Sequence, residues 1–268
     1  MITIARVAVS VFRESVRDKV LYSLVLFAVV LIAVSYLIGQ LTAGQDIKII
    51  KDLGLAAISI IGLLIAVFIG IGLVWKEVER RSIYSLLAKP IRRSEFVIGK
   101  YVGLALTLLV NVSAMTVAFY AVLWMMARTF PPEAQAAWPA PALDPALLKA
   151  IGLTLIELFL ITAIALFFST FTAPLLAAML TLGLWVIGTF NSDLRDFQQV
   201  VDSWIAALLA RWVYYLVPNF SAFDIKAQVV HGVAVPWSHV GLSALYGAVY
   251  ISLLLVGATT IFSRRDFK

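Results

Sequence analysis

Long apolar runs alternate with short polar segments along this chain. Six runs of 16 to 26 residues carry few or no charges. About 20 apolar helical residues, rising 1.5 Å each, cross a hydrocarbon layer of about 30 Å. The predicted spans are residues 20–41, 53–75, 101–126, 147–170, 175–190 and 240–262. The pattern predicts an all-α membrane protein with six transmembrane helices, in which residues 1–268 form a single domain.

The first nineteen residues have a different, amphipathic pattern. At 100° per residue, one helical stripe is apolar and the stripe beside it is polar and basic. The apolar stripe is Ile2, Ala5, Val9, Phe12 and Val16, and the polar stripe is Arg6, Ser10, Arg13 and Arg17. Residues 1–19 are predicted to form an interfacial helix in the headgroup region, with arginines reaching toward lipid phosphates. A frayed cytoplasmic tail is the alternative.

Two longer segments between spans are predicted to lie outside the membrane. Residues 128–146 contain five prolines, which break any regular element. Within residues 191–236, the stretch 200–217 is nearly long enough to cross the bilayer. However, Asp202 and Arg211 would each cost roughly 2.5–3.5 kcal/mol inside a span. This stretch is therefore expected to be an amphipathic, interfacial or re-entrant segment before the last span.

Composition excludes a water-soluble globule. Hydrophobic residues make up 62% of the 268 residues and charged residues 13%, with a mean hydropathy of +1.00, whereas soluble proteins are about 45–50% apolar and about 25% charged. The chain has no cysteine, which excludes a disulfide, a thiolate metal site and a cysteine nucleophile.

The distribution of basic residues predicts the orientation of the spans. Fourteen of the 21 Lys and Arg residues lie in the N-terminal segment, residues 76–100, the turn at 171–174 and the C-terminal tail. Cytoplasmic loops carry the excess of Lys and Arg in membrane proteins. We therefore expect a multi-pass protein of the plasma (inner) membrane with both termini and residues 76–100 in the cytoplasm. Residues 128–146 and 191–236 would be extracytoplasmic.

Residues 76–100 are the most distinctive segment of the chain. Ten of the 36 charged residues fall in these 25 positions, around a proline at position 90. The same segment contains Ile83, Tyr84, Leu86, Leu87 and Ile91. A loop that is merely solvated has no need of these apolar residues, so a partner or the membrane surface is expected to cover them. A solvated positive loop is the alternative.

This segment resembles one in the type-2 permeases of ABC transporters, especially the multicopper-enzyme-maturation permease branch. The shared features are Glu77 and Glu79, Arg81-Ser82 in place of Gly-Thr, Leu86-Leu87, Pro90, Arg92 or Arg93, and Gly99-Lys100. The resemblance extends along essentially the whole chain. It implies a homodimer, or a heterodimer with a second permease, bound to cytoplasmic ABC ATPase subunits, and it gives no role to nucleic acid.

The resemblance also implies which residues couple the permease to its ATPase. They are Glu77, Glu79, Arg80, Arg81, Leu86, Leu87, Pro90, Arg92 and Arg93. ATP-driven closure of the ATPases would act on this loop and rock the spans between inward and outward arrangements. The protein is accordingly expected to be an exporter.

The chain has no ATP site of its own. A phosphate loop requires G-x-x-x-x-G-K-[ST], but around Gly99-Lys100 the first glycine is replaced by Ser94 and the hydroxyl residue by Tyr101. The protein is therefore predicted not to be an enzyme, with no cofactor in this chain. ATP and Mg²⁺ are expected in the partner ATPase. His231 and His239 lack further ligands nearby in sequence, so no metal site is predicted.

Glu157 is the single carboxylate deep within a predicted span. A charge there is costly unless it is protonated, paired or hydrated. Glu157 and Asn111 are therefore candidates for a substrate path. A structural role is the alternative, with the carboxyl group hydrogen-bonded to Asn111, Thr107 or Ser113. Gly99 and Gly103 match the small-xxx-small packing pattern, which here is weak evidence of dimerisation.

Three other classes of protein compete with the permease. An ion-coupled secondary carrier usually has inverted repeats and several polar residues at mid-membrane, and this chain has no visible repeat and one such carboxylate. An intramembrane enzyme would need a motif such as His-Glu-x-x-His or Gly-x-Ser-x-Gly, and neither is present. A non-transporting scaffold for a membrane assembly remains open.

Overall fold

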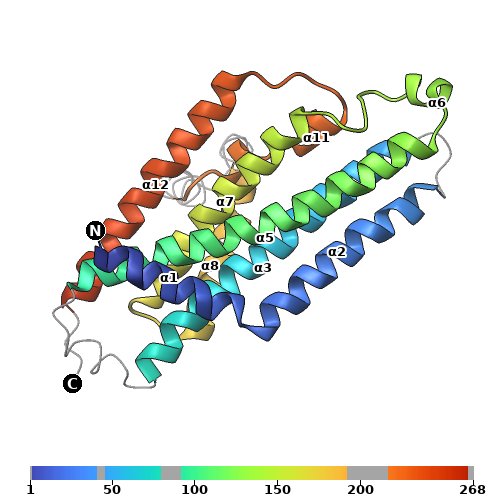
Figure 1. Cartoon of the computed structure of the whole chain (residues 1–268). Coiled ribbons are helices and arrows are strands. Elements are labelled where there is room, and N and C mark those ends of the chain that lie inside the picture. The colour runs from blue at the N-terminus through green and yellow to red at the C-terminus, as the bar shows by residue number, and fades with distance from the viewer. Residues whose placement is uncertain (1, 41–45, 80–91, 192–216, 265–268) are drawn as a thin grey trace.

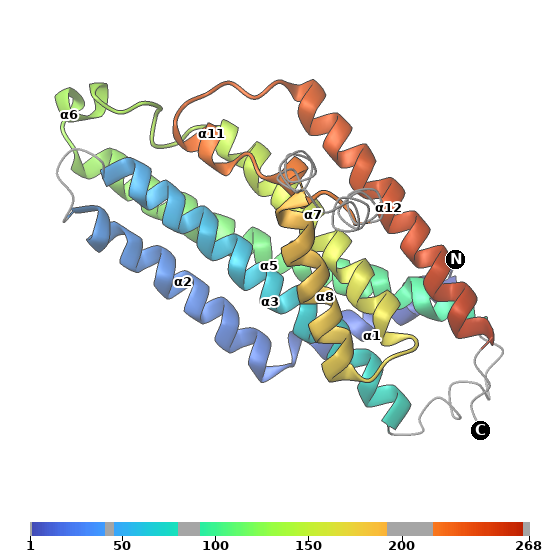
Figure 2. The same cartoon turned by 180° about the vertical axis from the view of Figure 1, so that it is seen from behind.

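The computed structural model describes residues 2–40, 46–79, 92–191 and 217–264, and this part of the chain contains helices and connecting segments but no strand. The long helices are α2 (Lys19–Gln40), α3 (Asp46–Glu79), α5 (Arg93–Thr129), α7 (Ala146–Ser169) and α12 (Trp237–Arg264). The shorter elements are α1 (Ile2–Val16), α6 (Pro132–Ala136), α8 (Pro174–Thr189), the 3₁₀ helix η1 (Phe220–Phe223) and α11 (Lys226–Val230). Figures 1 and 2 show α2, α3, α5, α7, α8 and α12 as one bundle whose successive helices run in opposite directions.

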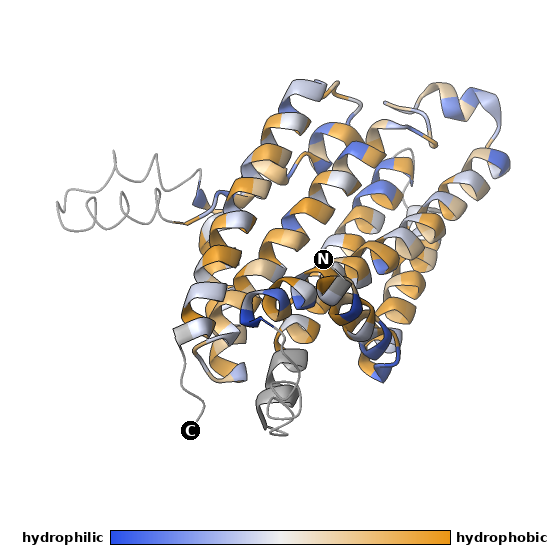
Figure 3. Ribbon diagram, turned by 60° about the vertical axis from the view of Figure 1, so that its left-hand side comes forward, coloured by the Kyte–Doolittle hydropathy of each residue, from blue (hydrophilic) through white to orange (hydrophobic). Residues whose placement is uncertain are grey.

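Five helices of the described part are long and apolar enough to cross a membrane. They are Lys19–Gly39, Asp46–Ile71, Arg93–Thr129, Ala146–Ser169 and Trp237–Ser263. The sixth predicted span corresponds to α8, an apolar helix of 16 residues. In Figure 3 hydrophobic residues extend along the bundle, while hydrophilic residues gather on α1 and at the opposite end.

The bundle has a buried centre and an apolar periphery. In the most apolar window of α3, 72% of residues are buried, against 22% in α2 and 11% in α12. Helix α3 packs closely on α7, where Leu158 lies against Gly62 and would have to move to admit a side chain there. Helices α3 and α7 are thus shielded by other helices, whereas α2 and α12 present apolar side chains outward.

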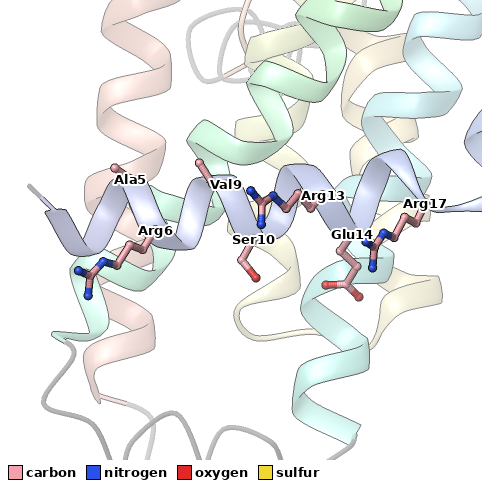
Figure 4. A pocket seen from close by; sticks show the side chains of 7 residues that line it. All are labelled: Ala5, Arg6, Val9, Ser10, Arg13, Glu14 and Arg17. Atoms are coloured by element: carbon pink, nitrogen blue, oxygen red, sulfur yellow. The ribbon is translucent and has the colours of Figure 1, made fainter.

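Two ends of the bundle are named from here on. The α1 end comprises α1, the start of α5, the turn between α7 and α8, and the end of α12. The α11 end comprises α11, the start of α12, and residues 130–146 with α6. Helix α1 lies across the first of these ends, transverse to the bundle helices (Figures 1 and 4).

The face by which α1 packs differs from the predicted one. Ala8, Val11 and Ser15 are buried, whereas Ala5 and Val9 of the predicted apolar stripe are exposed. The reason lies on α5, where Gly99 contacts Val7 and Gly103 contacts Val11 and Ala8 O. A Cβ atom at either glycine would lie about 2.7 Å from these groups. The small-xxx-small pattern therefore seats α1 within the chain.

The ends of α3 and α5 differ from the predicted limits of the segment 76–100. Residues 76–79 belong to α3, and residues 93–100 form the first two turns of α5, so only the middle of residues 76–100 lies between the two helices. Glu95 lies in the first turn of α5, where the helix dipole favours an acid. Phe96 and Val97 pack on α12 residues, which extends the helix below the predicted span.

Part of the predicted extracytoplasmic segment 191–236 is packed into the bundle. Phe220, Phe223, Ile225, Val229 and Val230 are each at most 1% exposed. Helix α11 contacts α3 and α7, and η1 contacts α7, α8 and α12. The stretch 200–217 proposed as an interfacial or re-entrant helix lies outside the described residues, apart from Val217.

Candidate functional site

The structure describes the side chains of two of the nine predicted coupling residues, Arg92 and Arg93. Glu77, Glu79, Arg80, Arg81, Leu86, Leu87 and Pro90 lie outside the described side chains. Arg92 is exposed and is the N-cap residue of α5. The two arginines are adjacent in sequence but differ in their contacts.

Arg93 joins the start of α5 to the end of α12. Its Nη1 atom donates hydrogen bonds to Phe262 O at 3.3 Å and Ser263 O at 3.0 Å. The last carbonyl groups of a helix have no partner within the helix, and a cation there also interacts favourably with the helix dipole. Arg93 therefore caps the C-terminal end of α12.

An aromatic and cationic stack reinforces this contact. The rings of Phe96 and Phe262 are stacked with their centroids 5.9 Å apart. The Nζ atom of Lys100 lies 4.8 Å from the Phe96 ring centroid, and Lys100 is only 2% exposed. A desolvated ammonium group over a ring interacts favourably with the ring's quadrupole. We call Arg93, Phe96, Lys100, Phe262 and Ser263 the α5–α12 junction.

Glu157 lies on α7 with a described partner on α8. It is 9% exposed, and its Oε1 atom accepts a hydrogen bond from Trp185 Nε1 at 3.0 Å. Asn111 is also buried, but its Nδ2 atom donates to Thr107 O within α5, at 2.6 Å. The hydrogen bond of Glu157 thus goes to a residue that the sequence did not suggest.

Charged residues of the segment before α12 form a second group of polar contacts, with α3. Lys226 Nζ lies 3.2 Å from Ser59 Oγ of α3 and 3.4 Å from Asp224 Oδ1. The contacts thus join Glu157 with Trp185, and Lys226 with Ser59 and Asp224. Sequence reasoning missed the partners in both groups because they come from segments that are distant along the chain.

Two further lysines are turned into the protein at the α11 end. Lys51 is 0% exposed and donates from Nζ to Pro141 O at 2.8 Å. Lys149 donates from Nζ to Val235 O at 2.8 Å, and the same atom lies 4.5 Å from the Trp237 ring centroid. Each lysine therefore ties a helix to a connecting segment through a backbone carbonyl group.

A groove on α1 presents cations to the surroundings. It has a volume of about 840 Å³. The described residues that line it are Ala5, Arg6, Val9, Ser10, Arg13, Glu14 and Arg17. Figure 4 shows Ala5 and Val9 pointing toward the side of the spans, and Arg6, Ser10 and Glu14 pointing the other way. We call this feature the α1 groove.

These features define the class of the protein and then its family. Five apolar helices of membrane-crossing length in the described part, packed as one bundle, make the chain a multi-pass helical membrane protein. A family model described as ABC-2 family transporter protein matches residues 5–267. The chain therefore belongs to the ABC-2 transporter family, as the sequence resemblance predicted. The match identifies the family and does not identify the multicopper-enzyme-maturation branch within it. No curated protein matches the chain.

Proposed function

We propose that this chain is the membrane-spanning subunit of an ATP-driven exporter, coupled to a separate cytoplasmic ATPase. The observation that carries the proposal is the family match over residues 5–267, because it includes the membrane helices and the coupling segment together. Membership of this family, with its apolar helices, already fits a permease of an ABC transporter. The direction of transport and the ATPase partner are the proposed additions.

The proposed topology has six membrane crossings, with α8 as the short one. Helices α2, α3, α5, α7, α8 and α12 alternate in direction (Figures 1 and 2), which supports this count. An even number of crossings keeps both termini on one side. The excess of Lys and Arg at the α1 end supports placing that end in the cytoplasm of a cell with an inner membrane.

The proposed coupling site is the segment between α3 and α5. Helix α3 ends at Glu79 and α5 begins at Arg93, so both lead toward the α1 end. The α5–α12 junction would pass a movement of this segment on to α12, because Arg93 and Phe96 hold the two helices together. ATP and Mg²⁺ would be bound by the ATPase, and the energy of hydrolysis would reach the bundle through this contact.

A second permease subunit is also proposed. Helices α2 and α12 expose many large apolar side chains, among them Leu26, Phe27, Leu245 and Leu253. Lipid covers such surfaces in a single subunit, and a partner subunit covers part of them in a dimer. Glu157, with Asn111 on the neighbouring helix α5, is the proposed candidate for contact with the transported molecule.

Co-purification tests this proposal directly. The permease would be co-expressed with an ATPase encoded beside it, and the amount of ATPase retained on the tagged permease would be measured. Reversing the charge at Arg80, Arg81 and Arg92 is expected to abolish retention. Reversing Lys48 and Arg128, which lie at the other end of the bundle, is the control and should leave retention unchanged. Full retention in the first variant would contradict coupling through residues 76–100.

A further inference from the structure

The α1 groove carries a row of cations on an exposed helix face. Arg6, Ser10, Arg13 and Arg17 follow one another at intervals of four, three and four residues, which places them on one side of the helix. The three arginines are exposed, and Glu14 is the one acidic residue among the described lining residues. The groove therefore carries an excess of positive charge and favours an anionic ligand.

The groove faces away from the bundle. The opposite side of α1 is buried on α5, where Ala8, Val11 and Ser15 are at most 4% exposed. Gly99 and Gly103 fix this seating, because α1 approaches α5 without intervening side chains at these two positions. What occupies the groove must therefore come from the surroundings of α1 and not from the helices behind it.

The two edges of the groove differ in polarity. On the edge toward the spans lie Ala5 and Val9, and Val9 is 44% exposed (Figure 4). On the other edge lie Arg6, Ser10 and Glu14. Helix α2 begins at Lys19, three residues after α1 ends, which holds α1 at the level where a membrane-crossing helix starts. An apolar edge toward the spans and a polar edge away from them match an amphiphile standing in a bilayer.

We propose that the α1 groove binds the phosphate headgroup of an acidic phospholipid. Arginine binds phosphate through paired N–H donors, and the three guanidinium groups outnumber the single carboxylate of Glu14. An acidic protein surface would satisfy the arginines but would leave Ala5 and Val9 on the groove edge without an apolar partner. This inference rests on the proposed function only in placing the α1 end at a membrane surface.

The experiment measures lipid retention by full-length protein in detergent. Native mass spectrometry would compare phosphatidylglycerol with phosphatidylcholine for the wild type, for Arg13→Gln with Arg17→Gln, and for Lys48→Gln with Arg128→Gln. Both double variants remove two positive charges. We expect phosphatidylglycerol retention to fall at least tenfold in the first variant and to change less than twofold in the second. Phosphatidylcholine retention should change in neither.

A blocking variant separates charge from shape. Ser10→Trp keeps all three arginines but fills the centre of the groove, so it should also reduce phosphatidylglycerol retention. Soluble glycerol 3-phosphate should compete weakly, because it lacks the acyl chains that the apolar edge would contact. Equal loss in the two double variants, unchanged retention in Ser10→Trp, or full competition by glycerol 3-phosphate would each overturn the proposal.

Two more outcomes test lipid binding in the α1 groove separately from the proposed function. If Arg13→Gln with Arg17→Gln lost the ATPase but kept phosphatidylglycerol, the groove would be a protein-docking surface and the lipid proposal would be wrong. Because the chain has no cysteine, Ser10→Cys provides a single labelling position. If this cysteine reacted from outside the cell while phosphatidylglycerol retention remained specific, the cytoplasmic orientation would fail and the lipid site would stand.

Discussion

The two ends of the bundle use basic side chains in opposite ways. At the α11 end, Lys51 and Lys149 turn inward and donate to carbonyl groups of connecting segments. At the α1 end, Arg6, Arg13 and Arg17 turn outward along an exposed groove. Lys51 and Lys149 therefore stabilise the fold, whereas the three arginines of α1 are available to a ligand.

The basic residues differ in their roles because the backbone at the two ends of the bundle has different hydrogen-bonding needs. Residues 137–145 and 231–236 are irregular segments whose carbonyl groups lack helical partners. In each segment a lysine from a neighbouring helix donates to one of these carbonyl groups. Gly232, with a φ of +73°, lies against Pro139 O and brings the two segments into contact. At the α1 end, hydrogen bonds within α1 satisfy the backbone groups between its first and last turns. Arg6, Arg13 and Arg17 of α1 are exposed and therefore available to a ligand.

Replacing Lys51 with alanine should produce the largest loss of stability. The substitution removes the hydrogen bond to Pro141 O and leaves a cavity where a fully buried side chain lay. We expect the free energy of unfolding to fall by about 3 kcal/mol, since a large buried truncation costs about 2–5 kcal/mol and an unpaired buried group about 1–3 kcal/mol. Thermal unfolding in a mild detergent measures the change.

Lys48 provides the control for this prediction. It lies one turn earlier on α3 and is only half-buried, so Lys48→Ala should change the free energy of unfolding by about 0.5 kcal/mol or less. Lys51→Met keeps most of the side-chain volume but loses the hydrogen-bond donor. Its loss in the free energy of unfolding should lie between those of Lys48→Ala and Lys51→Ala. Equal destabilisation by Lys48→Ala and Lys51→Ala would contradict the structural role assigned to the buried Lys51.

Glu157 tests whether a buried acid also serves the fold. Leucine at this position would leave Trp185 Nε1 without its acceptor, and we expect the free energy of unfolding to fall by about 2 kcal/mol. Glutamine keeps the Oε1 acceptor and should cost about 0.5 kcal/mol. The same unfolding assay measures both variants.

Transport by the glutamine variant then separates the two roles of Glu157. A folded Glu157→Gln protein with reduced transport would support a place in the substrate path. Unchanged transport would leave the carboxyl group with a structural role alone. Equal destabilisation by leucine and glutamine would contradict the importance of the hydrogen bond to Trp185.

Arg93 and Lys100 differ from the exposed arginines of α1, because Arg93 is turned toward α12 and Lys100 is buried. Arg93→Gln should lower the free energy of unfolding by about 1 kcal/mol, since it removes hydrogen bonds from a charged donor that remains partly exposed. Spin labels at Ser94→Cys and Ser263→Cys would report a broader distance between α5 and α12. Arg92→Gln removes the same charge one residue earlier and should leave that distance unchanged. Broadening in both variants would argue against a specific junction.

Sequence patterns predicted the long helices closely and the short packed segments poorly. The spans predicted at 147–170 and 175–190 correspond to α7, Ala146–Ser169, and α8, Pro174–Thr189. Their limits follow from apolar runs interrupted by prolines, which are local features. Phe220 and Phe223 are buried by helices distant in sequence, and four residues of 3₁₀ helix have no periodicity that could reveal such a partner.

Only part of the candidate site was predictable, because sequence patterns report local features and not contacts between distant helices. Glu157 stands out because it is an acid in an apolar run, so its burial follows from sequence alone. Its contact with Trp185 depends on the rotation of α8 about its axis, and α8 is apolar all round, so no stripe fixes that rotation. The packed face of α1 likewise depends on Gly99 and Gly103 of another helix, which a pattern within α1 does not contain.

The smallest effect on stability is expected where the cations face outward. Arg13 and Arg17 are exposed on the α1 groove, and exposed substitutions usually change the free energy of unfolding by about 0.5 kcal/mol or less. Arg13→Gln with Arg17→Gln should therefore unfold at nearly the wild-type temperature in lipid-free detergent. Added phosphatidylglycerol should raise the unfolding temperature of the wild type more than that of the variant, because a ligand stabilises only the state that binds it. A large loss of stability without lipid would mean that these arginines, like Lys51, hold the fold together, and the contrast between the two ends would disappear.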